Sequence, residues 1–442
     1  MSELDRIEHE RQRVEKVAQL HSDAERARMD WRKELRRDRR KGKEILGDAK
    51  NIRLALEHAP ELAGLVQHND LTRRIEFTRA PPWRTLTRGR VWTDDDEIDL
   101  ACWLQEWGVP VRSDSMLSRV VHAHAMKTAV HPVRDWLRSL PPWDGEPRIT
   151  EVLIEVLSAQ GDGQYLGGVL RRFMISAVAR VMQPGCKADH MIVLVGAQGS
   201  RKSSFALALG KPWSVESNSS FGSKDAIAEL DGAWIVECGE LAGMRRSEIE
   251  TVKNFVSKQV DRYRPAYGRA VIDQLRACVF IGTTNEDKFL LDYTGNRRFW
   301  PVRVSGRVNL TLLEQNREHL WAEALAAYEA GEQWYLTEAE EKLAATAQDG
   351  HRVVTEIEQD VATYLETLKV ASWKPEKRTT VLDVYRSICG DRDTENLNAR
   401  RQMETAIGQA IRRCGWACLG RVGKDRRTTY EYRGDNPDNP HT

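Results

Sequence analysis

The chain has 442 residues, which corresponds to about three domains of ordinary size. Hydrophobic residues make up 41% of it and charged residues 30%, so there is enough apolar material for buried cores, and global disorder is excluded. Lys and Arg total 67 against 66 for Asp and Glu. This balance excludes a uniformly basic nucleic-acid-binding protein, so any contact with nucleic acid must come from local patches.

The seven cysteines are scattered and odd in number, which favours a reducing compartment over a disulfide framework. No apolar run approaches the ~18 residues of a membrane span, and the first residues are charged rather than signal-like. We therefore expect a soluble protein of the bacterial host cytoplasm with no membrane partner. The spacing of Cys and His predicts no metal site made of protein ligands alone.

Residues 1–50 alternate acids and bases with few apolar positions, which is typical of a solvated helix or a mobile arm. The basic run 32–41 suits either a phosphate backbone or a solvated helical face. Residues 51–150 predict a helical N-terminal domain, in which the acids at 94–97 indicate a helix start. The turn-rich stretch 140–147 predicts the end of that domain.

Residues 151–305 alternate between helical periodicity and short apolar strands, which is the pattern of an α/β domain. An amphipathic helix is expected over 170–182. Residues 306–350 are rich in Ala, Glu and Leu and predict a helical segment. Buried parallel strands are expected over 191–195, 233–238 and 277–282.

Residues 355–434 predict a small separate α+β domain at the end of the chain. Helices followed by a basic hairpin favour a winged-helix-like fold, and a plain α+β cap is the alternative. Residues 435–442 are expected to be a disordered tail. The expected helices cover 361–368, 381–389 and 400–413, and the hairpin strands cover 416–422 and 427–432.

The strongest chemical signal is the glycine-rich run 196–203, which follows the first strand and opens a helix. A phosphate chain needs a tight loop whose N–H groups converge on it, and a helix N-terminus favours the same anion. Lys202 would contact the β- and γ-phosphates of ATP, and the Ser203 hydroxyl would bind Mg²⁺. Arg201 replaces the glycine that usually precedes this lysine, and it either weakens phosphate binding or adds a positive charge. The expected ATP-binding residues are Gly196, Gln198, Gly199, Ser200, Arg201, Lys202, Ser203 and Ser204.

Catalytic candidates follow the next two strands. Glu237 and Glu240 end the second strand, and we favour Glu240 as the Mg²⁺-side or water-activating carboxylate, although the two roles can be exchanged. Asn285 follows the third strand and suits contact with the lytic water or the γ-phosphate, unless it only forms a turn. Arg297 and Arg298 suit an arginine finger presented to a neighbouring subunit, and surface arginines without a role are the alternative.

Between the second and third strands, the segment 257–269 interleaves cations with tyrosines. Such a segment can follow a single strand of DNA, with cations on phosphates and an aromatic ring on a base. Contact between subunits is the alternative. The candidate DNA-binding residues are Lys258, Arg262, Tyr263, Arg264, Tyr267 and Arg269.

The order of these motifs resembles the virulence-associated protein E family of phage and genomic-island proteins, which belongs with the superfamily 3 helicases of the AAA+ class. The resemblance covers residues from about 90 to 305. It rests on the stretches Leu140–Gly145, Gly196–Ser203, Trp234–Leu241, Asp261–Arg269 and Thr294–Pro301. Together these motifs are specific, although each alone is modest.

The resemblance implies a hexameric ring that hydrolyses ATP between subunits and threads one DNA strand through a central pore. It assigns Lys202 and Ser203 to the Walker A motif, and Glu237 with Glu240 to the Walker B motif. Asn285 would be sensor 1, Arg297 or Arg298 the finger in trans, and 258–269 the pore hairpin. The expected function is an ATP-driven DNA helicase or translocase in replication of a phage or integrated element. The alternative is a nucleotide-gated regulatory ATPase that recruits replication or defence partners without unwinding DNA.

Overall fold

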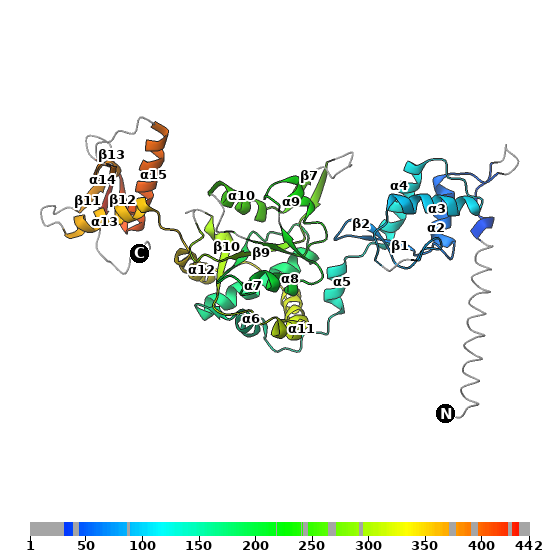
Figure 1. The fold of residues 1–442 in the computed structure, drawn as a ribbon, viewed down its shortest axis with the longest axis horizontal. Coiled ribbons are helices and arrows are strands. Elements are labelled where there is room, and N and C mark those ends of the chain that lie inside the picture. The colour runs from blue at the N-terminus through cyan, green and yellow to red at the C-terminus, as the bar shows by residue number, and fades with distance from the viewer. Residues whose placement is uncertain are drawn as a thin grey trace, which may run out of the picture. The chain divides into compact units, whose positions relative to one another are not determined.

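The computed structural model describes residues 31–38, 44–85, 89–217, 219–239, 241, 246–263, 271–290, 295–370, 377–389, 397–422 and 427–432. The chain divides into two compact units between His351 and Arg352 (Figure 1). Most of the predicted arm and all of the predicted tail lie outside the described residues.

The first unit opens with a small domain that contains strands as well as helices. Helices α2 (Ala49–His58), α3 (Asp94–Glu106) and α4 (Asp114–Ala125) pack with an antiparallel hairpin of β1 (Val66–Asn69) and β2 (Arg74–Phe77). The start of α3 is as predicted, with acids in its first turn and a capping box. The hairpin is a correction to the purely helical prediction. Its strands of four residues are too short and too polar to give a periodic signal.

The core of this unit is a six-stranded sheet in the order β3-β10-β4-β9-β6-β5. All neighbouring strands are parallel except β3, which pairs antiparallel with β10 at the edge. The fold is therefore mixed α/β with a largely parallel central sheet, as predicted. The strands are β3 (Ala159–Gln160), β4 (Met191–Val195), β5 (Ser214–Ser217), β6 (Ile235–Cys238), β9 (Val279–Thr284) and β10 (Phe299–Val304). Of these, β4, β6 and β9 were predicted, and β3, β5 and β10 were not.

Helices cover both faces of the sheet (Figure 1), and the alternation of β4 shows how. Ile192 and Leu194 point to the cluster built with α6 (Ile149–Leu157), α7 (Gly163–Met182), α8 (Lys202–Leu209) and α11 (Leu310–Glu329). Met191 and Val193 point to the opposite cluster with α9 (Lys224–Ala228) and α10 (Arg246–Val256). A strand buried on both faces explains the continuous apolar run that predicted it.

This unit also contains elements outside the central sheet and the helices packed on it. Helix α5 (Pro132–Ser139) packs against α7 and α11, so its side chains Val133 and Leu137 belong to the core. The predicted helical segment forms α11 and α12 (Glu338–Gly350), separated where the chain turns at Gly331. Between β6 and β9, the strands β7 (Val260–Tyr263) and β8 (Ile272–Leu275) form a separate hairpin.

The second unit contains the predicted helices and hairpin around its own apolar core. Its helices are α13 (Glu356–Val370), α14 (Val381–Cys389) and α15 (Leu397–Arg413). The three-stranded antiparallel sheet has the order β11-β13-β12, with β11 (Arg378–Thr380), β12 (Trp416–Val422) and β13 (Arg427–Tyr432). Strand β11 was not predicted.

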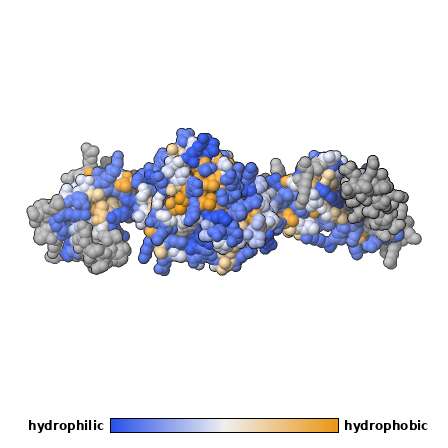
Figure 2. Space-filling model, turned by 90° about the horizontal axis from the view of Figure 1, so that it is seen from below, coloured by the Kyte–Doolittle hydropathy of each residue, from blue (hydrophilic) through white to orange (hydrophobic). Residues whose placement is uncertain are grey.

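The surface is mostly hydrophilic on the face drawn in Figure 2, with a gathering of hydrophobic residues on the central α/β core. Among the helices that the structure describes, none combines the length and the apolar character needed to span a bilayer.

Candidate nucleotide site

The glycine-rich run forms a loop between β4 and α8, as its sequence predicted. Gly196 lies so close to β10 that an added Cβ would stand 2.4 Å from the carbonyl oxygen of Val304. Gly199 has φ +80°, and Arg201 has φ 68° and ψ 30° at the N-cap of α8. Arg201 therefore adopts the left-handed conformation that glycine adopts without strain, which explains why glycine is usual at this position.

Lys202 is folded back into this loop. Its ammonium donates to the carbonyl oxygens of Gly196 (2.7 Å) and Ala197 (2.8 Å) and to the Ser200 hydroxyl (3.2 Å). A fourth hydrogen bond reaches Asn285 Oδ1 at 2.9 Å. Burial lowers the pKa of Lys202 below its usual value, because desolvation disfavours the charged form. All four acceptors are neutral, so a phosphate oxygen would be a stronger partner for this cation.

Glu237 lies beside the loop, at the end of β6. Its Oε1 accepts hydrogen bonds from the hydroxyls of Ser203 (2.9 Å) and Thr283 (2.7 Å). The side chain is buried, with 1% of the residue exposed, and Oε2 has no hydrogen-bond partner among the residues that the structure describes. A buried carboxylate oxygen without a partner costs free energy unless a cation or donor reaches it. Carboxylate and hydroxyl oxygens are ligands that Mg²⁺ prefers, so Ser203, Glu237 and Thr283 fit this ion.

A cavity of about 560 Å³ opens over these side chains. The loops that line it follow β4, β6 and β9, which are neighbours in the sheet, and the carboxyl ends of parallel strands are where such folds bind ligands. The lining residues are Gln198, Gly199, Arg201, Lys202, Ser203, Ser204, Glu216, Glu237, Gly239, Thr283, Thr284, Asn285 and Glu286.

Most of the predicted nucleotide-binding residues line this cavity. The exceptions are Gly196, whose carbonyl accepts from Lys202, and Ser200, whose hydroxyl donates to the Ala197 carbonyl at 2.8 Å. Thr283 was missed, although a polar pair that ends an apolar strand beside Asn285 is a signal in the sequence. Glu240, favoured for the Mg²⁺ side, lies outside the described residues, whereas Glu237 contacts the Ser203 hydroxyl directly.

The two candidate finger arginines lie in a short 3₁₀ helix, Asn296–Arg298, just before β10. Because β10 runs parallel to β4 with Phe299 opposite Met191, this turn lies at the amino end of the sheet, away from the glycine-rich loop. Neither arginine lines the cavity. The Arg297 side chain is 70% exposed, whereas Arg298 donates through Nε to the Ser257 hydroxyl at 2.6 Å.

The candidate DNA-binding segment is partly described. Lys258 and Arg262 are exposed, but each has an acid nearby: Asp261 at 3.9 Å and Asp273 at 3.6 Å. Tyr263 is only 9% exposed, and its hydroxyl accepts a hydrogen bond from Arg73 at 2.7 Å. This placement differs from the expectation that the Tyr263 ring stacks on a base. Arg264, Tyr267 and Arg269 lie outside the described residues.

Residues 137–353 match the profile described as the virulence-associated protein E-like domain. This part of the chain is a virulence-associated protein E-like domain. The whole candidate nucleotide site and the arginine turn of 296–298 lie within the domain.

No curated protein matches the chain. Among solved structures, the chain is similar to the A form apo structure of the NrS-1 C-terminal region (305–718), with 11% identity and a TM-score of 0.45 over 83% of this chain and 96% of that one. A second structure, titled the apo structure of the same region, has 12% identity and a TM-score of 0.45 over 83% of this chain and 95% of that one.

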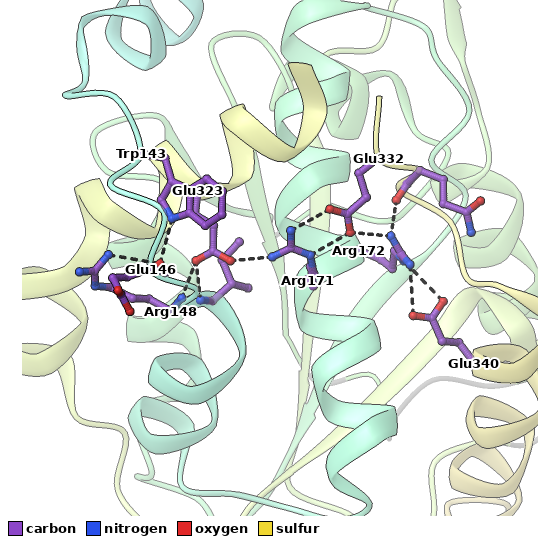
Figure 3. Close-up of polar contacts among 10 residues, drawn as sticks. Trp143, Glu146, Arg148, Arg171, Arg172, Glu323, Glu332 and Glu340 are labelled. Carbon is purple, nitrogen blue, oxygen red and sulfur yellow. Dashed lines mark hydrogen bonds and ion pairs between the residues drawn. The ribbon is translucent and has the colours of Figure 1, made fainter. Parts of the chain in front are cut away.

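Near the start of the virulence-associated protein E-like domain, hydrogen bonds connect a turn to helix α11 of the core (Figure 3). In the motif Leu140–Gly145 and just after it, Trp143 Nε1 donates to the Glu146 carbonyl at 2.9 Å, and Asp144 pairs with Arg148. Glu323 Oε2 accepts from the backbone N–H groups of Arg148 and Ile149, at 2.6 and 2.9 Å. The carboxylate thus satisfies two free donors at the start of α6 and positions the turn.

Proposed function

We propose that the chain is an ATP-dependent DNA helicase or translocase of superfamily 3, with an AAA+ type core, that serves replication of a phage or an integrated element. In this proposal ATP and Mg²⁺ bind in the cavity beside the glycine-rich loop. The observation that supports it most is the convergence of Lys202, Ser203, Glu237 and Asn285 at one edge of the sheet. Strand β9, inserted between β4 and β6, gives Asn285 its place in that cavity.

The chain's own residues divide the chemistry between them. Lys202 exchanges its neutral carbonyl acceptors for phosphate oxygens, while the N–H groups at the start of α8 face the same anion. Ser203, Glu237 and Thr283 supply the oxygen ligands for Mg²⁺. When held there, Mg²⁺ would supply positive charge that neutralises the transferred phosphoryl group. Asn285 is released from Lys202 and becomes available to the attacking water.

The proposal also requires a second protomer. Arg297 is exposed and lies at the edge of the sheet opposite its own glycine-rich loop, which suits a finger that acts on a neighbour's ATP. Arg298, bonded to Ser257, would position the turn. A closed ring, proposed to be a hexamer, brings each Arg297 to the next cavity, and the β7–β8 hairpin is proposed to face single-stranded DNA in the pore.

ATP hydrolysis, with and without single-stranded DNA, tests this proposal. Lys202→Ala and Glu237→Gln should each lower kcat on the order of 100-fold, because the first removes a cation from the reacting phosphates and the second removes the carboxylate proposed to hold Mg²⁺. Lys211→Ala, an exposed lysine beyond the end of α8, is the matched control and should leave the rate unchanged. A wild-type protein that hydrolyses no ATP, or a Lys202→Ala variant with wild-type turnover, would refute the assignment.

The second candidate is a nucleotide-gated regulatory ATPase that binds DNA or replication and defence partners without unwinding. Two observations favour it: acids lie beside Lys258 and Arg262, and Tyr263 is buried. Both reduce the positive charge and the aromatic surface that the described part of the hairpin presents to DNA. Strand displacement on forked DNA separates the two functions. The motor unwinds the fork with ATP, and Arg262→Ala lowers both DNA affinity and its salt dependence. ATP hydrolysis without strand displacement supports the regulatory function.

A further inference from the structure

The N-terminal domain contains a groove of about 810 Å³ between α2 and α4, outside the virulence-associated protein E-like domain. The two helices contact each other through their buried side chains. The groove is lined by side chains that lie nearer the surface than this buried contact. The residues that line it are Ala49, Lys50, Arg53, Leu54 and Glu57 from α2, and Met116, Arg119, Val120, Ala123, His124 and Lys127 from α4 and the turn after it.

The floor of the groove is apolar. Leu54, Met116 and Val120 are each half-buried, and Met116 and Val120 are four residues apart on the same face of α4. Two packed helices with such a floor can accept the apolar stripe of a third helix, which is the helix-in-groove mode of peptide recognition. The flexible Met116 side chain adapts to the shape of what lies on it.

Cations border the floor on both sides. Lys50 and Arg53 come from α2, and Arg119 and Lys127 come from the α4 side; all four are exposed. Glu57 is the only acid among the described lining residues, and it already accepts from Arg53 (2.9 Å) and from Lys127. These bonds lower the pKa of Glu57 to about 2, so it stays ionised. Four cations and one carboxylate leave an excess of positive charge on both sides of the groove.

His124 gives a second, independent indication of a ligand. It lines the groove, is 8% exposed, and its Nδ1 has no hydrogen-bond partner among the described residues. Burial lowers the pKa of His124 below its usual value, so the imidazole is neutral at physiological pH. A buried polar atom without a partner costs free energy that a donor or acceptor on a bound partner would recover.

The chemistry of the groove distinguishes a peptide from nucleic acid. No Phe, Tyr or Trp is among the described residues that line it, so a base would find no ring on which to stack. The aliphatic floor instead matches Leu, Ile or Val side chains. We propose that the groove between α2 and α4 docks an acidic amphipathic helix of a partner protein, with its apolar stripe on Leu54, Met116 and Val120 and its acids beside the flanking cations.

Selection from a displayed library of helical peptides of about 15 residues, four helical turns, tests this inference with the full-length chain. The selected peptides should carry apolar residues at i, i+4 and i+7 with Asp or Glu on both sides of that stripe. Lys50→Glu combined with Arg119→Glu reverses one cation on each side of the groove and should weaken a selected peptide at least about tenfold, equivalent to about 1.4 kcal/mol. Lys211→Glu combined with Lys342→Glu, two exposed lysines outside the groove, is the control for charge and folding.

Three results would overturn the inference. One is a selection that enriches no acidic amphipathic peptide. Another is a selected peptide whose affinity is equal for the groove variant and the control. The third is an oligo-dT strand that loses binding on Lys50→Glu with Arg119→Glu while peptides fail to bind, which would make the groove a nucleic-acid surface. None of these measurements depends on ATP hydrolysis, so their failure is distinct from failure of the motor assignment.

Discussion

Arg201 places a charged side chain where the backbone favours glycine. Its φ of 68° costs a non-glycine residue about 1 kcal/mol, and the side chain lines the cavity beside the glycine-rich loop. The sequence left two consequences open, weaker phosphate binding or an added positive charge. The structure shows the loop in its strained but intact conformation, with Lys202 in place. We therefore expect the added charge to dominate.

Two substitutions at Arg201 separate backbone strain from charge. Arg201→Gly should raise the free energy of unfolding by about 1 kcal/mol, whereas Arg201→Ala should not, because alanine keeps the strain. Both should weaken ATP binding to a similar extent, since both remove the guanidinium. Denaturant unfolding and ATP titration measure the two effects. Tighter ATP binding in Arg201→Gly than in the wild type would show that backbone conformation, and not charge, sets the affinity.

His190 provides a pH-dependent test of the arginine turn. Its ring stacks on Trp300 with centroids 3.8 Å apart, and the Trp300 Nε1 donates to the Arg297 carbonyl at 3.2 Å. Burial lowers the pKa of His190 from 6.5 to about 3. The unfolded chain therefore binds this proton first as the pH falls. Stability from His190 is complete above about pH 6.5 and is lost toward pH 3, at about 1.4 kcal/mol per pH unit.

His190→Phe should keep the stacked ring and remove this proton. Between about pH 7 and 5, the free energy of unfolding should then fall less steeply with decreasing pH in the variant than in the wild type. The difference between the two slopes should correspond to about one bound proton. Burial also lowers the pKa of His124, His131 and His351, so a shallower slope remains. Equal slopes in the wild type and His190→Phe would mean that His190 is not buried as described.

At the residue scale, sequence spacing predicted the loop conformation, whereas tertiary packing determines which distant side chains contact one another. The separation of Gly196, Lys202 and Ser203 predicted the loop between β4 and α8, because the backbone path of such a loop is local. The contact of Ser203 with Glu237 joins residues 34 positions apart and depends on which strands are neighbours. Thr283 ends an apolar strand beside Asn285, which is a signal in the sequence, but its contact with Glu237 likewise depends on strand order. Burial of Tyr263 under Arg73 depends on a separate domain and has no local signal.

At the scale of elements, strands were predictable where both faces are buried. Strand β4 is a continuous apolar run, whereas β10 contains Pro301 and Arg303 and follows two arginines. Proline lacks the N–H that a central strand donates, which argues against a strand at this place. The structure resolves the conflict, because β3 pairs only with Arg303 and Val304, so β10 is an edge at Pro301. The number of residues over which two distant strands pair cannot be predicted from the local sequence of either strand.

Helices α7, α11 and α12 are joined by a network of ion pairs (Figure 3). Arg171 pairs with Glu323 (2.6 Å) and Glu332 (2.7 Å), and Arg172 pairs with Glu332 (2.8 Å) and Glu340 (3.3 Å). The Glu323 side chain is 1% exposed and also caps α6. The Glu323 carboxylate accepts charge-assisted hydrogen bonds from Arg171 and from two backbone N–H groups, and such bonds contribute more than exposed ion pairs do.

Glu323→Gln should therefore lower the free energy of unfolding by about 2 kcal/mol, because it removes the charge that strengthens these hydrogen bonds while Arg171 keeps Glu332. Glu329→Gln, an exposed acid on the same helix, is the control and should change it by less than about 0.5 kcal/mol. Chemical denaturation followed by far-UV circular dichroism compares the two. Equal stability of both variants would show that the contacts of Glu323 with Arg171 and with the start of α6 do not stabilise the fold.

At the scale of the whole molecule, β4 connects the two ends of the proposed reaction. Its amino end lies beside the turn that carries Arg297, and its carboxyl end leads into the loop that carries Lys202. Within one protomer, Arg297 and Lys202 lie at opposite ends of the same sheet, so they cannot meet at one ATP molecule. A head-to-tail assembly can, because each protomer then supplies Arg297 to the cavity of the next.

Activity of mixed variants tests this central claim most directly. Lys202→Ala and Arg297→Ala should each be inactive alone, because one lacks the phosphate lysine and the other lacks the finger. Mixed in equal amounts and allowed to exchange subunits, they should regain ATP hydrolysis at up to about a quarter of the interfaces, where an intact cavity meets an intact Arg297. A mixture of Lys202→Ala with Glu237→Gln should stay inactive, since both changes lie in the same cavity. No recovery in the first mixture, or equal recovery in both, would contradict an ATP site that two protomers complete.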